Sequence, residues 1–277
     1  MPVTFVVVPQ WQGSPSSRAM RHAEGAAAIA EDLPAARTRH VNVPLEAGDD
    51  QGTGVTRFSA LQLVRERLTD VLGEVEGPAI TIGGDCAVSA AAVAHAVRVS
   101  PELYGGDVAL IWFDAHPDLN SPETSPSGAF AGMVLHALVD GGTVPPERTF
   151  LAGARSWDAG EEAFASETGL RAFGVEELAS PDALVEAVVA SGAASIYLHV
   201  DLDVLDPSEL NGLLDPEPFG LAATTLVATI KALTTRLPLA GATLAAYAPG
   251  SPDGRIDDAP TLLRIVGALA SGSQPAR

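Results

Sequence analysis

The sequence predicts a single α/β domain in which helices cover both faces of a central, mainly parallel β-sheet. Short apolar runs alternate with amphipathic stretches along the whole chain, as in repeated β-α units. The runs are apolar at nearly every position, which is typical of parallel strands buried on both faces. No linker or internal repeat interrupts this pattern, so residues 1–277 are predicted to form one domain, with roughly the last six residues disordered.

Each expected element follows from its local pattern. Strands are predicted where aliphatic and aromatic residues run together, at 3–8, 78–85, 108–113, 148–155, 195–200 and 239–249. Helices are predicted where Ala, Leu and Val recur at three- and four-residue spacing, at 17–33, 58–75, 87–98, 131–140, 181–191, 221–236 and 260–270. Stretches rich in Gly, Asp, Ser and Pro are expected to be loops, at 48–54 and 121–128.

The chain is acidic, with 16 Lys and Arg against 35 Asp and Glu and a net charge of −19. This balance excludes the basic surface typical of nucleic-acid-binding proteins. No apolar run reaches the roughly 18 residues that a membrane-spanning helix needs, and the N-terminal segment is expected to be a first strand rather than a signal peptide. A single cysteine excludes an intramolecular disulfide and fits a reducing, cytoplasmic location.

Two acidic clusters directly follow predicted strands. DAHPD follows the strand VALIWF, and DLDVLD follows the strand SIYLHV. Side chains alternate faces in an extended chain, so Asp114, His116 and Asp118 can converge, and so can Asp201 and Asp203. Neither cluster contains a Lys or Arg, and carboxylates this close need a compensating cation. The clusters therefore predict a divalent metal site.

A third motif, GGDC, also follows an apolar strand, and in parallel sheets ligands bind at the edge where the strands end. The three motifs can therefore meet although they lie far apart in the chain. Single residues have structural alternatives, because an Asp after a strand often caps a helix. Asp206, before Pro207, is expected to open a turn, and His199 lies outside the acidic alternation and is expected to be structural.

These motifs resemble those of the ureohydrolases, the family that includes arginase, agmatinase and formimidoylglutamase. GGDC, DAHPDLN and LHVDLDVLDP stand where that family has GGDH, DAHxD and DxDxxDP, and the resemblance extends over residues 5–265. It implies a three-layer α-β-α sandwich with two manganese ions and a bridging hydroxide that hydrolyses guanidino or amidino C–N bonds of a small-molecule substrate. It also implies a homo-oligomer, either a trimer or a hexamer.

The resemblance assigns metal roles by motif position. Asp114 and Asp201 would bridge the two metals and hold the hydroxide between them. His116 and Asp203 would complete one metal site, and Asp118 would serve the other.

On the substrate side, three residues match family positions that contact the substrate. Asn120 lies in DAHPDLN, Ser127 in the SG pair, and Asp158, a looser match, in ARSWD.

One metal position departs from the family, because Cys86 stands where GGDH has its histidine. A thiolate there would ligate metal and favour Zn²⁺ or Fe²⁺ over Mn²⁺. Alternatively, Cys86 is a small buried hydrophobe, and both interpretations remain open.

The residues that would recognise and protonate a guanidinium are largely replaced. The family's SGNxHGMP reads SGAFAGMV, so Ala129 and Ala131 occupy the Asn and His positions. Ala246 stands in place of a guanidinium-binding Glu, and a cation loses its charge-assisted partner there. His136 is expected to be structural rather than a substitute for the lost histidine. Asp215 occupies a Thr position and is expected to cap a turn rather than replace the lost acid.

Two readings from different classes follow, with a third as a variant of the first. In the first, the protein is a metal-dependent hydrolase that acts on a linear amidine, guanidine or related C–N bond, with a substrate other than arginine. In the second, it is a non-catalytic homologue that binds one metal or none and has a structural or regulatory role. In the third, it is a zinc- or redox-tuned enzyme in which Cys86 is a true ligand.

Overall fold

The computed structural model describes residues 3–272 and contains one eight-stranded sheet, with strand order β2-β1-β3-β8-β7-β4-β5-β6. Every strand pair is parallel, which confirms the predicted α/β class. The strand bounds are β1 Thr4–Val8, β2 Thr38–His40, β3 Ala79–Gly83, β4 Val108–Phe113, β5 Thr149–Ala152, β6 Arg171–Phe173, β7 Ser195–Asp201 and β8 Leu239–Ala245.

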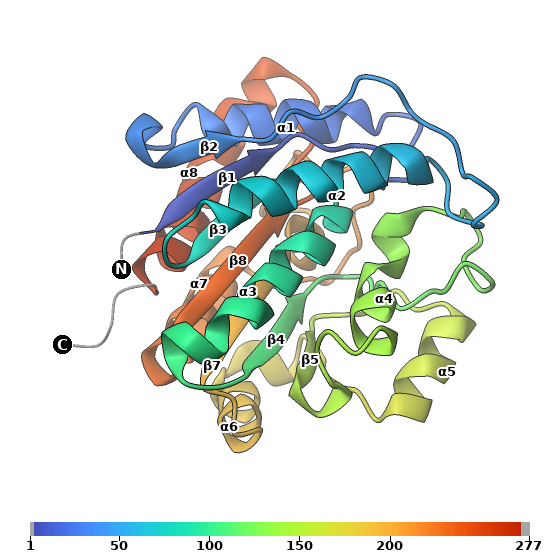
Figure 1. Cartoon of the computed structure of the whole chain (residues 1–277). Helices are drawn as coiled ribbons and strands as arrows, with labels where there is room; N and C mark the ends of the chain where they lie inside the picture. Colours follow the sequence, from blue (N-terminus) through green and yellow to red (C-terminus); the bar gives the residue numbers. More distant parts are fainter. Residues whose placement is uncertain (1–2, 273–277) are drawn as a thin grey trace.

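Helices cover both faces of the sheet and complete a three-layer α-β-α sandwich (Figure 1). Buried side chains of α1, α6, α7 and α8 join one apolar cluster with one face of the sheet, and those of α2, α3 and α4 join a second cluster with the other face. In Figure 1, α2 and α3 lie in front of the sheet. The helix bounds are α1 Met20–Ala30, α2 Phe58–Gly73, α3 Ser89–Tyr104, α4 Val134–Asp140, α5 Ala159–Thr168, α6 Asp182–Ala190, α7 Ala223–Arg236 and α8 Pro252–Ser271.

The four central strands end at one level, and this alignment positions the predicted motifs. Phe113 of β4 pairs with Val200 of β7, which pairs with Leu244 of β8, which pairs with Ile82 of β3. The chain between β3 and β4 skips two positions in the sheet, which β8 and β7 later fill. As a result, GGDC, DAHPD and DLDVLD emerge at the same edge, where ligands bind in parallel sheets.

Three elements are absent from the sequence-based prediction. The strands β2 and β6 are three-residue edge strands, largely exposed at their polar positions, so neither shows an apolar run. The helix α5 (AGEEAFASET) has few apolar residues, and its start is marked instead by a polar signal: the side chain of Glu161 accepts a hydrogen bond from the backbone N–H of Asp158 at 2.9 Å. An acid three residues into a helix is such a start signal.

Two predicted helix boundaries differ from the structure. The closing helix was predicted over 260–270, but α8 begins at Pro252 and continues through Pro260. Ser251 caps it by accepting a hydrogen bond from the backbone N–H of Gly254 at 3.1 Å. The region predicted as helix 131–140 starts as a 3₁₀ turn over Phe130–Met133 before α4 begins. The predicted disorder of the last residues concerns 273–277, which lie outside the described residues.

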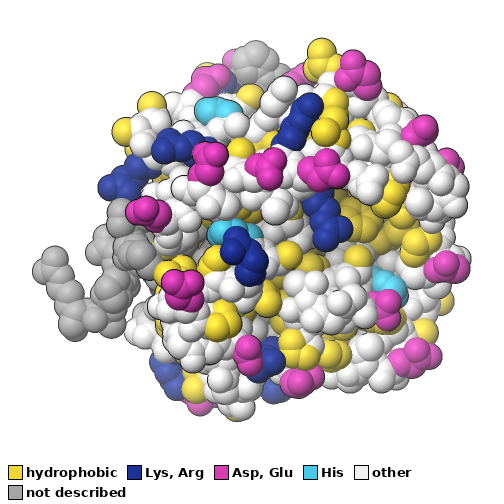
Figure 2. Space-filling model, in the orientation of Figure 1, with side chains coloured by type: hydrophobic (Ala, Val, Ile, Leu, Met, Phe, Trp, Pro, Cys, Tyr) yellow, Lys and Arg dark blue, Asp and Glu magenta, His cyan; other side chains and the backbone are white. Residues whose placement is uncertain are grey.

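The surface carries the acid excess without one dominant charged patch on the visible face. Figure 2 shows Asp and Glu side chains spread over this face, interspersed with fewer Lys and Arg. Within residues 3–272, none of the helices combines the length and the apolar character that a membrane crossing requires.

Candidate metal centre and cavity

A cavity of about 550 Å³ opens at the carboxyl edge of the central strands. Its walls come from the segments after β3, β4, β5, β7 and β8, together with residues 14–16, 125–132 and 213–217. It brings together all the residues that the sequence predicts for metal and substrate: Cys86, Asp114, His116, Asp118, Asn120, Ser127, Asp158, Asp201 and Asp203.

Asp114 and Asp201 each turn the chain at the end of a strand. Asp114 Oδ1 accepts from the backbone N–H of His116 at 2.7 Å, and Asp201 Oδ1 accepts from that of Asp203 at 2.8 Å. Bonds from an Asp side chain to the backbone two residues on stabilise such turns. Asp114 Oδ2 also accepts from Trp112 Nε1 at 3.1 Å. The two carboxylates are therefore held in fixed orientations by the backbone that carries them.

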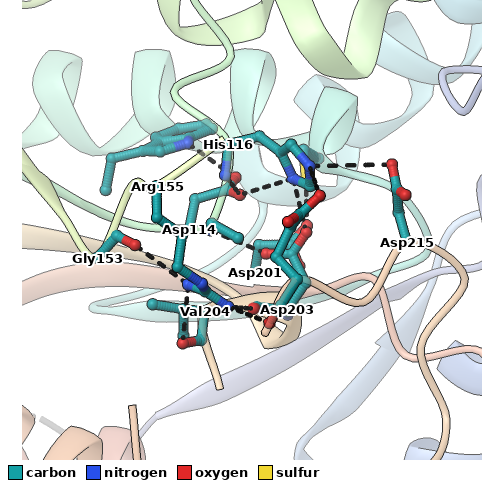
Figure 3. A network of polar contacts seen from close by, with 12 residues as sticks. Asp114, His116, Gly153, Arg155, Asp201, Asp203, Val204 and Asp215 are labelled. Carbon is teal, nitrogen blue, oxygen red and sulfur yellow. Dashed lines mark hydrogen bonds and ion pairs between the residues drawn. The ribbon is translucent and has the colours of Figure 1, made fainter. Parts of the chain in front are cut away.

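The two acidic clusters meet through His116. Its Nδ1 lies 2.9 Å from Asp203 Oδ2 and 3.7 Å from Asp114 Oδ1. Figure 3 shows His116 between these two carboxylates. Asp203 Oδ1 accepts from the backbone N–H of Ala115 at 3.0 Å. Burial alone would lower the pKa of His116, but the hydrogen bonds to Asp114 and Asp203 outweigh it and raise this pKa to about 12. In the metal-free protein, His116 is thus a cation that offsets part of the carboxylate charge.

The remaining carboxylates are left without enough compensating charge. Burial, followed by the nearby charges of Asp114 and Asp201, raises the pKa of Asp118 well above its usual value. Asp118 is held in the left-handed region at φ +54°, and its Oδ2 is buried without a hydrogen-bond partner among the described residues. Burial and the charges of Asp203 and Asp114 likewise raise the pKa of Asp201. These carboxyl groups would be stabilised as carboxylates by a bound cation.

Cys86 lies against the same carboxylates. It is buried in the first turn after β3, and its Sγ donates a hydrogen bond to Asp201 Oδ2 at 2.8 Å. Burial, followed by the charges of Asp201, Asp118 and Asp114, raises the pKa of the thiol. Without metal, Cys86 is therefore a neutral thiol that points at a carboxylate rather than a purely apolar packing residue.

His199 does not lie away from the acidic side of β7, as the sequence interpretation assumed. It is two residues before Asp201 in a regular part of the strand, so the two side chains share a face. His199 is fully buried, stacks on Trp112 with 3.5 Å between ring centroids, and lies with Nε2 3.8 Å from Asp114 Oδ2. The i, i+2 spacing was the signal that could have placed it at the site.

The donor set fits divalent metal ions. Among the described residues, three groups of side chains have ligand atoms within 4.8 Å of one another: Cys86, Asp114, His199 and Asp201 in the first, Asp114, His116 and Asp203 in the second, and His116, Asp215 and Glu217 in the third. The first two lie among the buried carboxylates and are the candidate ligand groups, and Asp114 belongs to both of them. The unpartnered Asp118 Oδ2 and His199 Nε2 are buried polar atoms of the kind that a metal satisfies. Carboxylate, imidazole and thiol donors together suit a transition metal.

The residues predicted to contact substrate already make hydrogen bonds within the protein. Asn120 Nδ2 donates to Asp158 Oδ2 at 2.9 Å, and Asn120 Oδ1 accepts from Thr124 Oγ1 at 2.9 Å. Ser127 Oγ accepts from the backbone N–H of Ala129 at 3.2 Å. All of them border the cavity, but the amide of Asn120 has its donors and acceptor directed within the protein.

A loop at 213–220 forms the mouth of the cavity and is fixed by two side chains that carry no sequence signature of this role. Arg155 donates to the backbone carbonyls of Asp203, Glu217 and Pro218 at 2.8 to 2.9 Å, so it joins the loop to the second acidic cluster. Asp206 accepts from the backbone N–H of Ser208 at 3.0 Å, as expected for a turn, and also from that of Phe219 at 2.9 Å.

Two acidic side chains on this loop face His116. Asp215 Oδ2 and Glu217 Oε1 lie 3.9 and 3.8 Å from His116 Nε2. Asp215, expected to cap a turn, instead borders the cavity with a largely exposed carboxylate. Glu217 was not predicted as a site residue. A Glu between two prolines, as in residues 216–218, is equally typical of a turn.

The three alanines that replace polar family residues all border the cavity. Ala246 adopts a left-handed conformation at φ +66°, which a non-glycine residue seldom does outside functional sites. His136 lies outside the cavity wall and packs on Phe164 with 4.2 Å between ring centroids, in line with the structural role expected for it.

The sequence of this chain matches a known protein family over most of its length. The model of the arginase family matches residues 13–256 of the chain. The chain belongs to the arginase family. Among curated relatives, the N(omega)-hydroxy-L-arginine amidinohydrolase of Streptomyces lavendulae is 29% identical over 240 residues, 82% of each protein. The arginase of Bacillus subtilis is 28% identical over 173 residues, which span 57% of this chain and 56% of that enzyme.

Solved structures of arginase-family proteins have the same fold as this chain. An arginase of Entamoeba histolytica in complex with L-ornithine superposes with a TM-score of 0.84 at 23% identity, covering 96% of this chain and 97% of that one. The formimidoylglutamase of Bacillus subtilis superposes with a TM-score of 0.78 at 16% identity, covering 99% and 88%. The identity to these structures is low, so they show the fold alone, and the family model over residues 13–256 is what makes the chain a divergent member of the arginase family.

Proposed function

We propose that this arginase-family protein is a metal-dependent hydrolase that cleaves a C–N bond of a small linear amidine or related amide-like molecule, and that arginine is not its substrate. One observation carries the proposal: the carboxylates of Asp114, Asp118, Asp201 and Asp203 converge in one cavity, where Asp118 Oδ2 has no partner among the described residues. Buried carboxylates in such density are costly unless a cation satisfies them.

The chain's own residues would hold and orient the reacting groups. Bound divalent metal, Mn²⁺ by family resemblance or Zn²⁺ or Fe²⁺ in view of Cys86, would supply a Lewis acid that activates water and polarises the attacked carbon. Asp114 belongs to both ligand groups and would bring two ions side by side. Asp201 is anchored by the backbone N–H of Asp203, so its carboxylate needs little reorganisation to bind.

The cavity wall argues against an amino acid such as arginine as the substrate. Among its described residues there is no Lys or Arg to pair with a substrate carboxylate. The amide of Asn120 donates to Asp158, and Ala246 offers no carboxylate to a guanidinium. Asp215 and Glu217 at the mouth disfavour anionic molecules. The substrate is thus proposed to be uncharged or cationic and to lack a carboxylate. The Streptomyces lavendulae relative is an N(omega)-hydroxy-L-arginine amidinohydrolase, and this supports attack at an amidino-type carbon.

Substitution of Asp114 tests this proposal. Metal-reconstituted wild-type protein is expected to release ammonia or urea from at least one member of a panel of linear amides, ureas, amidines and guanidines that includes agmatine, and to leave arginine unhydrolysed. Asp114→Asn should lower that turnover on the order of 10³-fold or more and reduce the bound metal measured by mass spectrometry. Asp140→Asn, an exposed change of the same charge at the end of α4, should leave both unchanged. Equal turnover of wild type and Asp114→Asn would refute the mechanism.

Alanine stands at positions 131 and 246, where the resemblance places polar residues. This favours a second candidate, a non-catalytic homologue that keeps a metal for structural or regulatory use. This candidate predicts about one metal ion per chain and no turnover of any panel member. Robust turnover of any of them excludes it.

We also propose that the protein is a cytoplasmic homo-oligomer. The exposed side chains of Ile256 and Leu263 support assembly, because they are seven residues apart on α8 and share one helix face. Light scattering after size exclusion should then give a trimer or hexamer mass, and a monomer mass would contradict this assignment.

A further inference from the structure

His199 has a buried nitrogen that the protein leaves unsatisfied. It is fully buried in β7, and its Nε2 has no hydrogen-bond partner among the described residues. That atom lies 3.8 Å from Asp114 Oδ2, and it shares a group with Cys86 Sγ and Asp201 in which all ligand atoms lie within 4.8 Å. Leaving a buried polar atom unpaired is destabilising, so an unpaired nitrogen among carboxylates points to a ligand that the chain does not supply.

A hydrogen-bond chain behind His199 fixes which nitrogen is free. His199 Nδ1 lies 2.8 Å from Ser89 Oγ, and Ser89 donates its hydroxyl proton to Thr243 Oγ1 at 3.0 Å. Because Ser89 has only that one proton to give, it accepts from Nδ1–H, and Nε2 is left as an unprotonated lone pair. A hydrogen bond on one ring nitrogen is what orients a histidine that binds metal through the other nitrogen. Stacking on Trp112 holds the ring plane.

The position of this imidazole complements the departure at Cys86. The resemblance to GGDH places a histidine at position 86, at the end of β3, but this chain has a cysteine there. His199 reaches the same group of ligand atoms from β7, on the other side of β8. Removing an imidazole from one strand and presenting one from another leaves the number of imidazole donors at the centre unchanged.

We propose that His199 is a metal ligand, which binds through Nε2 together with Asp114, Asp201 and the Cys86 thiolate. The inference rests on the proposed metal centre but adds a ligand to it and moves the imidazole donor from β3 to β7. With one sulfur and one nitrogen beside two carboxylate oxygens, this set of donors would favour Zn²⁺ or Co²⁺ over Mn²⁺.

The wild-type protein allows a direct test with the metal alone. Crystals of chelator-stripped protein reconstituted with Zn²⁺ are expected to show an anomalous peak about 2.0–2.1 Å from His199 Nε2 and about 2.3 Å from Cys86 Sγ. A zinc peak that is bound by Asp114 and Asp201 but lies beyond bonding distance of His199 Nε2 overturns the proposal, and so does the absence of zinc from this group.

Variants give a second, independent readout. His199→Ser should lower the affinity of this site for Zn²⁺ on the order of 100-fold, measured by calorimetry on stripped protein. Adding Cys86→His to that variant returns an imidazole to β3 and should restore binding, whereas His136→Ser, which changes a histidine outside the cavity, should bind like wild type. Unchanged affinity of a folded His199→Ser overturns the proposal. If that variant does not fold, the anomalous map of the wild type decides.

This test separates the ligand from the reaction. Zinc bound through His199 with no hydrolysis of any panel compound leaves the ligand in place and refutes the proposed function. Hydrolysis of a panel compound by protein whose metal does not contact His199 leaves the proposed function in place and refutes His199 as a ligand.

Discussion

His22, on α1, is a buried imidazole that the fold requires in its neutral form. It borders the cavity, is 6% exposed, and has no partner for Nδ1 among the described residues. Burial lowers its pKa to about 4, the charge of Arg21 adds to this, and a hydrogen bond to the backbone of Tyr247 opposes it. Because the folded pKa lies below the ordinary value of 6.5, the stability that depends on neutral His22 is complete above pH 6.5. It is lost as the pH falls from 6.5 towards 4.

We therefore expect His22→Phe to remove an acid-sensitive part of the stability. Between pH 7 and pH 4, wild type should lose up to about 3 kcal/mol of unfolding free energy relative to this variant. Denaturant titrations in chelator would measure the difference without a contribution from metal release. His40→Phe, on the exposed edge strand β2, is the control and should follow wild type. Parallel pH profiles of wild type and His22→Phe would contradict the assignment.

The sequence points to the right residues of the candidate site, but not for the right reason. Asp114, His116 and Asp118 do meet in one cavity, yet β4 ends at Phe113, Asp114 turns the chain, and Asp118 is left-handed, so the alternation of an extended chain is not what brings them together. His199 obeys i, i+2 spacing relative to Asp201, but a histidine inside an apolar strand carries no sign of whether it faces metal or core. Arg155 acts through backbone carbonyls of distant loops, so no local pattern marks it.

At the scale of elements, α1 packs closely on the segment after β8, which includes the cavity residue Ala246. A Cβ added at Gly25 would lie 1.9 Å from the carbonyl oxygen of Tyr247, so the helix and that segment touch backbone to backbone. Ala246, the strained cavity residue, is held on its other side by a hydrogen bond from its N–H to the carbonyl of Gly84 at 2.7 Å. The helix α1 therefore helps to hold Ala246 in its left-handed conformation.

Two glycines in helices should respond oppositely to alanine. Gly25→Ala must push α1 away from Tyr247, and we expect a loss of about 1–3 kcal/mol of unfolding free energy. Gly267→Ala, in α8, meets no atom within 4 Å of the added Cβ and should gain about 0.5–1 kcal/mol from helix propensity. Thermal and denaturant unfolding of the two variants would measure both changes. A neutral Gly25→Ala would mean that the α1 contact is looser than the structure has it.

Elements that bury an apolar face were predictable from periodicity, because burial itself selects their residues. The strands β4 and β7 are fully buried and read as continuous apolar runs. The edge strands β2 and β6 are set by backbone pairing with a neighbour, and α5 by its polar start, so hydrophobic spacing says nothing about them. Strand order was also beyond local pattern, since β7 and β8 insert between β3 and β4 from far along the chain.

The molecule has a net charge of −19 and a buried acidic centre at the carboxyl ends of its central strands. Divalent metal should stabilise the folded protein by binding at this centre rather than by screening the acidic surface. An ion that binds only the folded protein adds about 2.7 kcal/mol at a hundred times its dissociation constant. We expect Zn²⁺ or Mn²⁺ at that excess to raise the unfolding free energy of chelator-stripped protein by this amount.

Sodium chloride at equal ionic strength screens the surface charge and should give a smaller gain. The ion-specific part should vanish in Asp114→Asn, which removes the carboxylate common to both ligand groups, and should persist in Asp140→Asn. Thermal unfolding of the three proteins with each salt would measure it. If Asp114→Asn were stabilised by metal as strongly as wild type, the ions would be acting on the acidic surface, and the centre would not be their binding site.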